Sequence, residues 1–219
     1  MRVLVIHCGT SYRDQLINYL NNKNVKIIEL NFDSVTYRVK EKLGEGDDIR
    51  IQIDNFLEKL GDFEGVIFAG GTIRGSLVPG IYRKIKSWSM GFIRELETPF
   101  LGICLGHMML GFAYGATYNV MNKRFENPIK EEKGLVDIYF HREFPLLPNK
   151  RHLIVYEDHE RELSRLPNCL VNTASSRNCF IQAIYHTDLL KYGVQFHPEV
   201  TGTEGNLIID NFLKVLRKM

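Results

Sequence analysis

One stretch decides the fold of this chain: Phe100-Leu101-Gly102-Ile103-Cys104-Leu105-Gly106-His107. A short apolar run ends at a cysteine held between two glycines, and a helical pattern follows at once, which predicts a strand, a tight turn and a helix. A nucleophile on such a turn has strained φ and ψ angles, and side chains two residues to either side would collide where strand and helix diverge. Gly102 and Gly106 leave the space that this turn needs.

Cys104 is therefore the predicted nucleophile. The turn places its thiol at a helix N-terminus, whose partial positive charge favours the reactive thiolate. The alternative interpretation is a buried structural cysteine at the end of a strand. The remaining cysteines, Cys8, Cys169 and Cys179, show neither C-x-x-C spacing nor the spacing of metal ligands, so we expect a reducing cytoplasmic location and neither a metal nor another cofactor.

Length and composition limit the possible classes of protein. With 219 residues, 44% hydrophobic and 25% charged, the chain is expected to form a single globular domain over residues 1–219. A net charge of +2 is too small to indicate a nucleic-acid partner. The first apolar run, Val3 to Ile6, is far shorter than a membrane span, so no membrane association is expected.

Apolar runs alternate with helical patterns in the first half of the chain. These runs cover 3–6, 25–30, 65–69 and 100–103, and the polar stretch 31–48 between two of them is expected to be irregular or weakly helical surface. Beyond Ala113 come short strand-like runs with little helix between them, at 135–140, 152–156, 169–174, 180–185 and 192–196, and a helix starts near Gly205. We expect an α/β fold with an open, mostly parallel sheet flanked by helices and a nucleophile elbow.

Two further segments follow strand-like runs and supply groups that a thiolate needs. His197 suits the base, and Glu199, two residues on and on the same side of an extended segment, suits the group that orients it. Gly70 and Gly71 let the backbone approach a ligand. Each segment alone is an ordinary loop or turn, but parallel strands bring their carboxyl ends to one crevice, where we expect these residues to meet Cys104.

The residues 102–107 and 192–199 resemble the nucleophile motif and the His-Glu motif of the class I glutamine amidotransferases. This resemblance implies a flavodoxin-like sheet and glutamine as the substrate. By the same resemblance Cys104 attacks the side-chain amide carbon of glutamine, His197 passes a proton to the departing ammonia, and Glu199 orients His197. The backbone N–H groups of Leu105 and Gly71 would hold the oxyanion.

The chain departs from this family at several positions. Met108 stands where the family usually has glutamine, and Thr72 where it usually has proline. Within the family the layout most resembles the stand-alone amidotransferase subunit of GMP synthase. Asp158 and His159 lie where that subunit carries Ser-His-Gly-Asp, so the resemblance implies that Met108, Asp158 and His159 contact the substrate.

The resemblance also implies a partner. The chain has neither a P-loop nor the Ser-Gly-Gly-Val-Asp-Ser sequence of ATP pyrophosphatases, so a separate synthase subunit must receive the ammonia. Two alternatives stay open. Met108 would also suit a hydrolase of another γ-glutamyl compound, such as a γ-glutamyl peptide. The fold could also serve a catalytically silent binding module, although such a module has no need of Cys104, His197 and Glu199 together.

Overall fold

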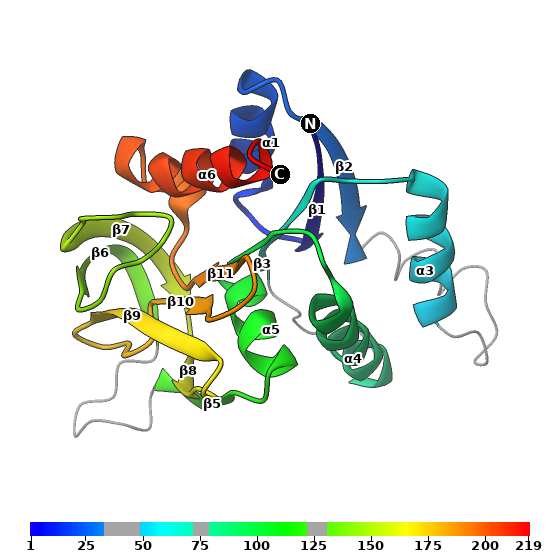
Figure 1. Ribbon diagram of the computed structural model, residues 1–219. Coiled ribbons are helices and arrows are strands. Elements are labelled where there is room, and N and C mark those ends of the chain that lie inside the picture. The colour runs from blue at the N-terminus through cyan, green and yellow to red at the C-terminus, as the bar shows by residue number, and fades with distance from the viewer. Residues whose placement is uncertain (33–48, 72–78, 122–130) are drawn as a thin grey trace.

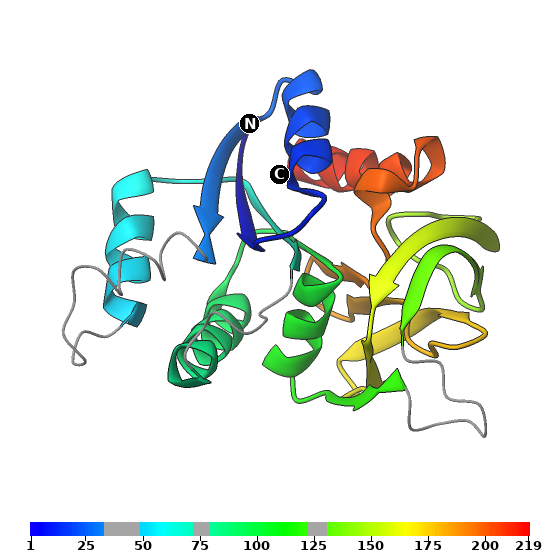
Figure 2. The same ribbon diagram turned by 180° about the vertical axis from the view of Figure 1, so that it is seen from behind.

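A computed structural model describes residues 1–32, 49–71, 79–121 and 131–219 (Figures 1 and 2). Most of the polar stretch 31–48, and Thr72, lie outside the described residues. The helices are α1 (Arg13–Asn22), α3 (Ile49–Leu60), α4 (Pro79–Glu95), α5 (Leu105–Ala113) and α6 (Thr203–Leu216), with a 3₁₀ turn η2 (Pro198–Val200). The strands are β1 (Arg2–Cys8), β2 (Lys26–Asn31), β3 (Gly65–Gly71), β4 (Phe100–Ile103), β5 (Thr117–Val120), β6 (Glu132–Phe140), β7 (His152–His159), β8 (Arg161–Arg165), β9 (Leu170–Ser176), β10 (Ala183–His186) and β11 (Lys191–Val194).

The described strands form one large sheet in the order β2-β1-β3-β4-β11-β10-β9-β6-β7, and β5 pairs with β8 in a small second sheet. The first five strands of the large sheet are parallel, and their order is that of a flavodoxin-like sheet. The strands from β10 to β7 continue it in antiparallel pairs. The expected α/β fold is confirmed.

Alternate residues of the parallel strands face opposite sides of the sheet, and each side has its own core. On one side Val5 and Ile67 pack with apolar residues of α1 and α6. On the other side Leu4 and Phe68 pack with residues of α3, α4 and α5. Figure 1 shows the resulting layers, with α1 and α6 above the parallel strands, α4 and α5 below them, and α3 to the right, beside β2. Because helices cover both faces, these strands read as continuous apolar runs in the sequence.

This topology brings the carboxyl ends of β1, β3, β4 and β11 to the same edge of the sheet. The register places β4 directly between β3 and β11, with Ile103 opposite Val194. The segments that follow these strands therefore meet in one place, as expected. Within the described residues, no helix is long and apolar enough to cross a membrane.

Candidate active site

Cys104 occupies a turn that only this glycine pattern allows. Its φ angle is 51°, in the left-handed region, where a non-glycine residue is strained. A Cβ atom added at Gly102 would lie 2.4 Å from the backbone of Gly106, and one added at Gly106 would lie 1.9 Å from the carbonyl oxygen of Phe68 in β3. The two glycines therefore let α5 pass close to β4 and β3, which is the space predicted from the sequence.

The same turn fixes the thiol at the start of α5. The backbone N–H of Cys104 donates to the carbonyl of Val194 at 2.8 Å, so the turn is tied to β11. The side chain is partly exposed, and its Sγ lies 4.0 Å from the backbone oxygen of Asp158. Cys104 thus stands at the N-terminal, positive end of the α5 dipole.

His197 follows β11 and forms a buried pair with Glu199. The His197 Nδ1 lies 2.8 Å from the Glu199 Oε1, and the two side chains are 3% and 0% exposed. The expected proximity is present, but the expected extended segment is not: residues 198–200 form the 3₁₀ turn η2. Pro198 starts this turn, and the turn rather than strand geometry brings the carboxylate back to the ring.

The charge state of His197 follows from its neighbours. Burial alone would lower its pKa, but the negative charges of Glu199 and Cys104 outweigh burial and hold the pKa well above its usual value. The pKa of His107, which belongs to the nucleophile motif, is shifted in the opposite direction. His107 is fully buried, and burial lowers its pKa to about 3, so it stays neutral. His197 is therefore the histidine placed to exchange a proton beside Cys104.

Both predicted glycines lie at the end of β3. Gly70 packs between the reactive side chains: an added Cβ would lie 2.8 Å from the His197 Cε1 and 3.4 Å from the Cys104 Cβ. Gly71 has a φ of +147°, and a Cβ there would lie 2.3 Å from the carbonyl oxygen of Cys8. Any side chain at either position would therefore displace a catalytic candidate or the end of β1.

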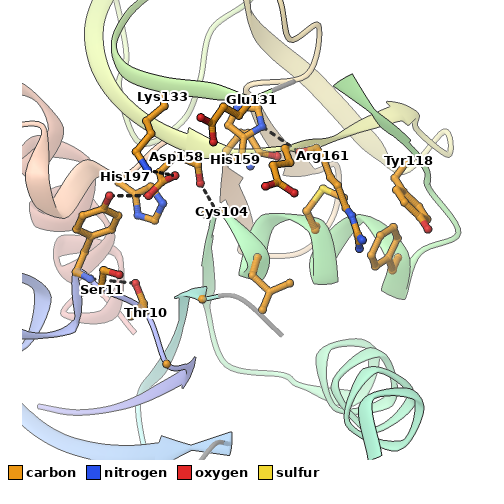
Figure 3. Close-up of a pocket in the computed structure, with 18 of the residues that line it drawn as sticks. Thr10, Ser11, Cys104, Tyr118, Glu131, Lys133, Asp158, His159, Arg161 and His197 are labelled. Atoms are coloured by element: carbon orange, nitrogen blue, oxygen red, sulfur yellow. Dashed lines mark hydrogen bonds and ion pairs between the residues drawn. The ribbon is translucent and has the colours of Figure 1, made fainter. Parts of the chain in front are cut away.

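A crevice of about 640 Å³ opens above these residues (Figure 3). Most of the site residues predicted from the sequence line this crevice. Those that do so are Gly71, Cys104, Leu105, Met108, Asp158, His159 and His197. Gly70 and Glu199 are not among the lining residues, and both support His197 instead. The volume is typical of a site for a small molecule.

Tyr12 is a site residue that the sequence prediction missed. Its hydroxyl donates to the Asp158 Oδ2 at 2.8 Å, and the other carboxylate oxygen of Asp158 lies 3.4 Å from the Lys133 Nζ. Figure 3 shows Asp158 and Lys133 beside His197. A usable signal existed, because Tyr12 stands just after the carboxyl end of β1, the same edge of the sheet that carries Cys104.

His159, which lines the crevice, also belongs to a buried polar network. Its Nε2 lies 3.2 Å from a carboxylate oxygen of both Glu132 and Glu157. Burial lowers the pKa of His159, but these carboxylates outweigh burial and raise it to about 10, so the ring is an imidazolium. Burial also raises the pKa of Glu157 above its usual value, against the opposing effect of His159. The network anchors the end of β7, which presents the Asp158 carbonyl to Cys104.

Among the described residues, one group in this region has the composition and spacing of possible metal ligands. Ligand atoms of Glu132, His159 and Cys179 all lie within 4.8 Å of one another. The Glu132 oxygens are already hydrogen-bonded, however, by the Ser176 hydroxyl at 2.8 Å and the Gln182 amide at 3.0 Å. We therefore interpret the group as a hydrogen-bonded network that supports the crevice wall.

The family model "Glutamine amidotransferase class-I" matches residues 4–216. This chain belongs to the class I glutamine amidotransferase family. A relative from Sulfolobus acidocaldarius, named as a subunit of glutamine-hydrolyzing GMP synthase, is 30% identical over 220 residues, which cover 100% of both chains. The corresponding subunit of Saccharolobus solfataricus is 34% identical over 221 residues, again covering 100% of both chains.

Solved structures agree with the fold of this class I amidotransferase. A crystal structure from Thermoplasma acidophilum has a TM-score of 0.76 at 21% identity and covers 100% of this chain and 94% of that chain. A glutamine amidotransferase from Thermotoga maritima has a TM-score of 0.65 at 23% identity, with 100% and 84% covered. The family expected from the sequence motifs, its fold and its enzymatic class are confirmed.

Proposed function

We propose that this amidotransferase hydrolyses the side-chain amide of glutamine through a thioester on Cys104 and supplies the ammonia to a separate synthase subunit. The observation that carries the proposal is the arrangement of one strained cysteine and one buried His-Glu pair at the ends of the neighbouring strands β4 and β11. A thiolate, a proton carrier and an orienting carboxylate are the groups that acyl transfer from an amide requires.

The reaction proceeds in two acyl-transfer steps. The Cys104 thiolate attacks the amide carbon, the C–N bond breaks, and His197 gives its proton to the nitrogen that leaves as ammonia. Water then attacks the γ-glutamyl thioester, His197 removes a proton from this water, and glutamate and the thiolate are released. Glu199 keeps the Nδ1 of His197 occupied, so that the other ring nitrogen faces the reacting atoms.

Each step passes through an oxyanion that needs hydrogen-bond donors. We assign these donors to the backbone N–H groups of Leu105, at the start of α5, and Gly71, at the end of β3. Both residues line the crevice beside Cys104. Each such donor contributes on the order of 3 kcal/mol to the stability of the transition state. The contacts that require glycine at the preceding position, Gly70, support this assignment, because they bring the end of β3 against His197 and Cys104.

The partner in this proposal is a synthase subunit of the GMP synthase kind. Relatives that match this chain over their whole length are named as one subunit of a glutamine-hydrolyzing GMP synthase, which implies a second subunit. The sequence itself contains no P-loop with which to activate an acceptor. In this proposal residues 1–219 form one amidotransferase domain whose ammonia leaves for a second polypeptide.

The test measures ammonia and glutamate release from glutamine by the purified chain, with and without the synthase subunit. Cys104→Ala is expected to abolish release, whereas Cys169→Ala, a change at a partly exposed cysteine outside the crevice, is expected to leave it unchanged. A γ-glutamyl dipeptide serves as the second substrate, because Met108 lines the crevice where the family usually has glutamine. Turnover of the dipeptide but not of glutamine would replace this proposal with a γ-glutamyl hydrolase.

A further inference from the structure

The two ends of the crevice differ in their charged groups. At one end Asp158 is held by the Tyr12 hydroxyl and by Lys133. At the other end lie two cations, Lys86 from α4 and Arg161 from β8. Within the described residues, neither of these two cations forms an ion pair. The crevice lining also includes Glu131 and Glu160, but among the described residues neither carboxylate is ion-paired with Lys86 or Arg161. Two unpaired cations in a concave site attract an anion.

Aromatic rings hold these cations in place. The Lys86 Nζ lies 3.9 Å from the centroid of the Phe112 ring and 5.9 Å from that of Tyr118, and the Arg161 guanidinium carbon lies 5.9 Å from the Tyr118 centroid. Burial and the charge of Arg161 both lower the pKa of Lys86. An anion bound between them would relieve this repulsion. We call Lys86, Phe112, Tyr118 and Arg161 the basic end of the crevice.

The basic end lies within reach of a glutamine bound at Cys104. Cys104, Met108 and Phe112 are spaced four residues apart and follow one face of α5, at about 6 Å per step. Four C–C bonds of about 1.5 Å separate the amide carbon of glutamine from its α-carboxylate carbon, so the carboxylate lies at most about 6 Å away, beside Met108. Side chains on a helix lean toward its N-terminus, so the Phe112 ring of α5 lies toward this point. The Lys86 ammonium of α4 lies over that ring, 3.9 Å from its centroid.

We propose that Lys86 and Arg161 bind the α-carboxylate of glutamine, while Met108 packs against its methylene groups. This inference rests on the proposed function and extends it to the recognition of the substrate. It also gives a physical reason for the methionine: where two cations bind the carboxylate, position 108 needs to supply apolar contact and no hydrogen bond. Phe112 and Tyr118 position the two cations and are not assigned a contact with the substrate.

The test measures, by calorimetry, the affinity of several variants for three ligands. Every variant also carries Cys104→Ala, so that no turnover occurs. The ligands are glutamine, glutaramate, which lacks the α-amino group, and the amide of γ-aminobutyric acid, which lacks the α-carboxylate. Lys86→Met and Arg161→Met are each expected to weaken binding of glutamine and glutaramate by roughly 10- to 100-fold. Neither change is expected to weaken binding of the ligand without a carboxylate.

Matched controls are available on the same two elements. Lys84→Met on α4 and Arg165→Met on β8 remove exposed cations that do not line the crevice, and both are expected to bind all three ligands like the protein with Cys104→Ala alone. Unchanged glutamine affinity in Lys86→Met and Arg161→Met, an equal loss with all three ligands, or no glutamine binding at all would overturn the inference. Ammonia release by the unmodified chain is measured separately and reports on the proposed function alone.

Discussion

The ring of Tyr12 packs edge-on against the imidazole of His197, with the two centroids 4.5 Å apart and the planes at 64°. Because the Tyr12 hydroxyl also donates to Asp158, one side chain braces both the base and the segment whose carbonyl faces Cys104. The β1 end therefore contributes to the geometry of a site whose reactive groups follow β4 and β11.

Tyr12→Phe is expected to keep the ring contact and lose the hydrogen bond, lowering kcat by about 2- to 10-fold. Tyr12→Leu loses both and is expected to lower kcat further. The matched control is Tyr19→Phe, because the Tyr19 hydroxyl donates to Asp210 at the same distance, 2.8 Å, outside the crevice. Steady-state ammonia release measures all three, and equal rates for Tyr12→Leu and the parent would contradict the bracing role.

Glu199→Gln tests the charge on the buried pair. Removing the carboxylate charge lowers the pKa of His197, so the protonated ring is lost at lower pH and the alkaline limb of kcat/KM moves toward neutral pH. We also expect kcat to fall about 100-fold or more, because the ring loses its fixed orientation. The measurement is the pH profile of kcat/KM, and an unshifted alkaline limb would show that Glu199 does not set the pKa of His197.

Gly106→Ala tests the elbow. The added methyl would meet the Phe68 carbonyl, so we expect a loss of about 3 kcal/mol or more in the free energy of unfolding. Gly91→Ala in α4 is the control, because its Cβ would meet nothing within 4 Å, and it should stabilise by roughly 0.5 to 1 kcal/mol. Urea unfolding compares the two. Similar effects from both changes would mean that α5 does not pass β3 as described.

The His159 network predicts a dependence of stability on pH. The pKa of His159 is raised by its carboxylate partners to about 10, so their stabilising effect is complete below about pH 6.5 and is lost as pH rises toward 10. The free energy of unfolding should fall by on the order of 5 kcal/mol over this range. Urea unfolding of Glu132→Gln should show a smaller fall, while exposed Glu131→Gln should match the parent. A parallel decline in all three proteins would refute the charged pairing.

The sequence was sufficient to predict the part of the site that backbone sterics determine. Gly102 and Gly106 bracket a strained residue, and this glycine pattern between an apolar run and a helix predicted the turn at Cys104. The alternation of apolar runs and helical patterns likewise predicted the parallel half of the sheet. His197 and Glu199 could be paired from their spacing, but the pairing arises from a 3₁₀ turn, because Pro198 does not continue a strand.

Polar strand residues limited the prediction elsewhere. β6 begins at Glu132 rather than at the predicted residue 135. A glutamate in a sequence usually indicates an exposed position, but the Glu132 carboxylate is buried and hydrogen-bonded by Ser176 and Gln182. The small sheet of β5 and β8 was missed, since both strands are short and rich in polar or exposed residues. Lys86 and Arg161 were missed for a different reason. They lie on elements that are far apart in the sequence, and only the folded chain brings them together.

The central claim is that Cys104 carries the γ-glutamyl group. Rapid acid quenching of the chain during turnover of glutamine, followed by mass spectrometry of its peptides, measures this directly. The account predicts one γ-glutamyl adduct on the peptide that contains Cys104, present also in Cys169→Ala and absent in Cys104→Ala, which should release no ammonia. Undiminished ammonia release by Cys104→Ala, or an adduct on any other residue, would contradict it.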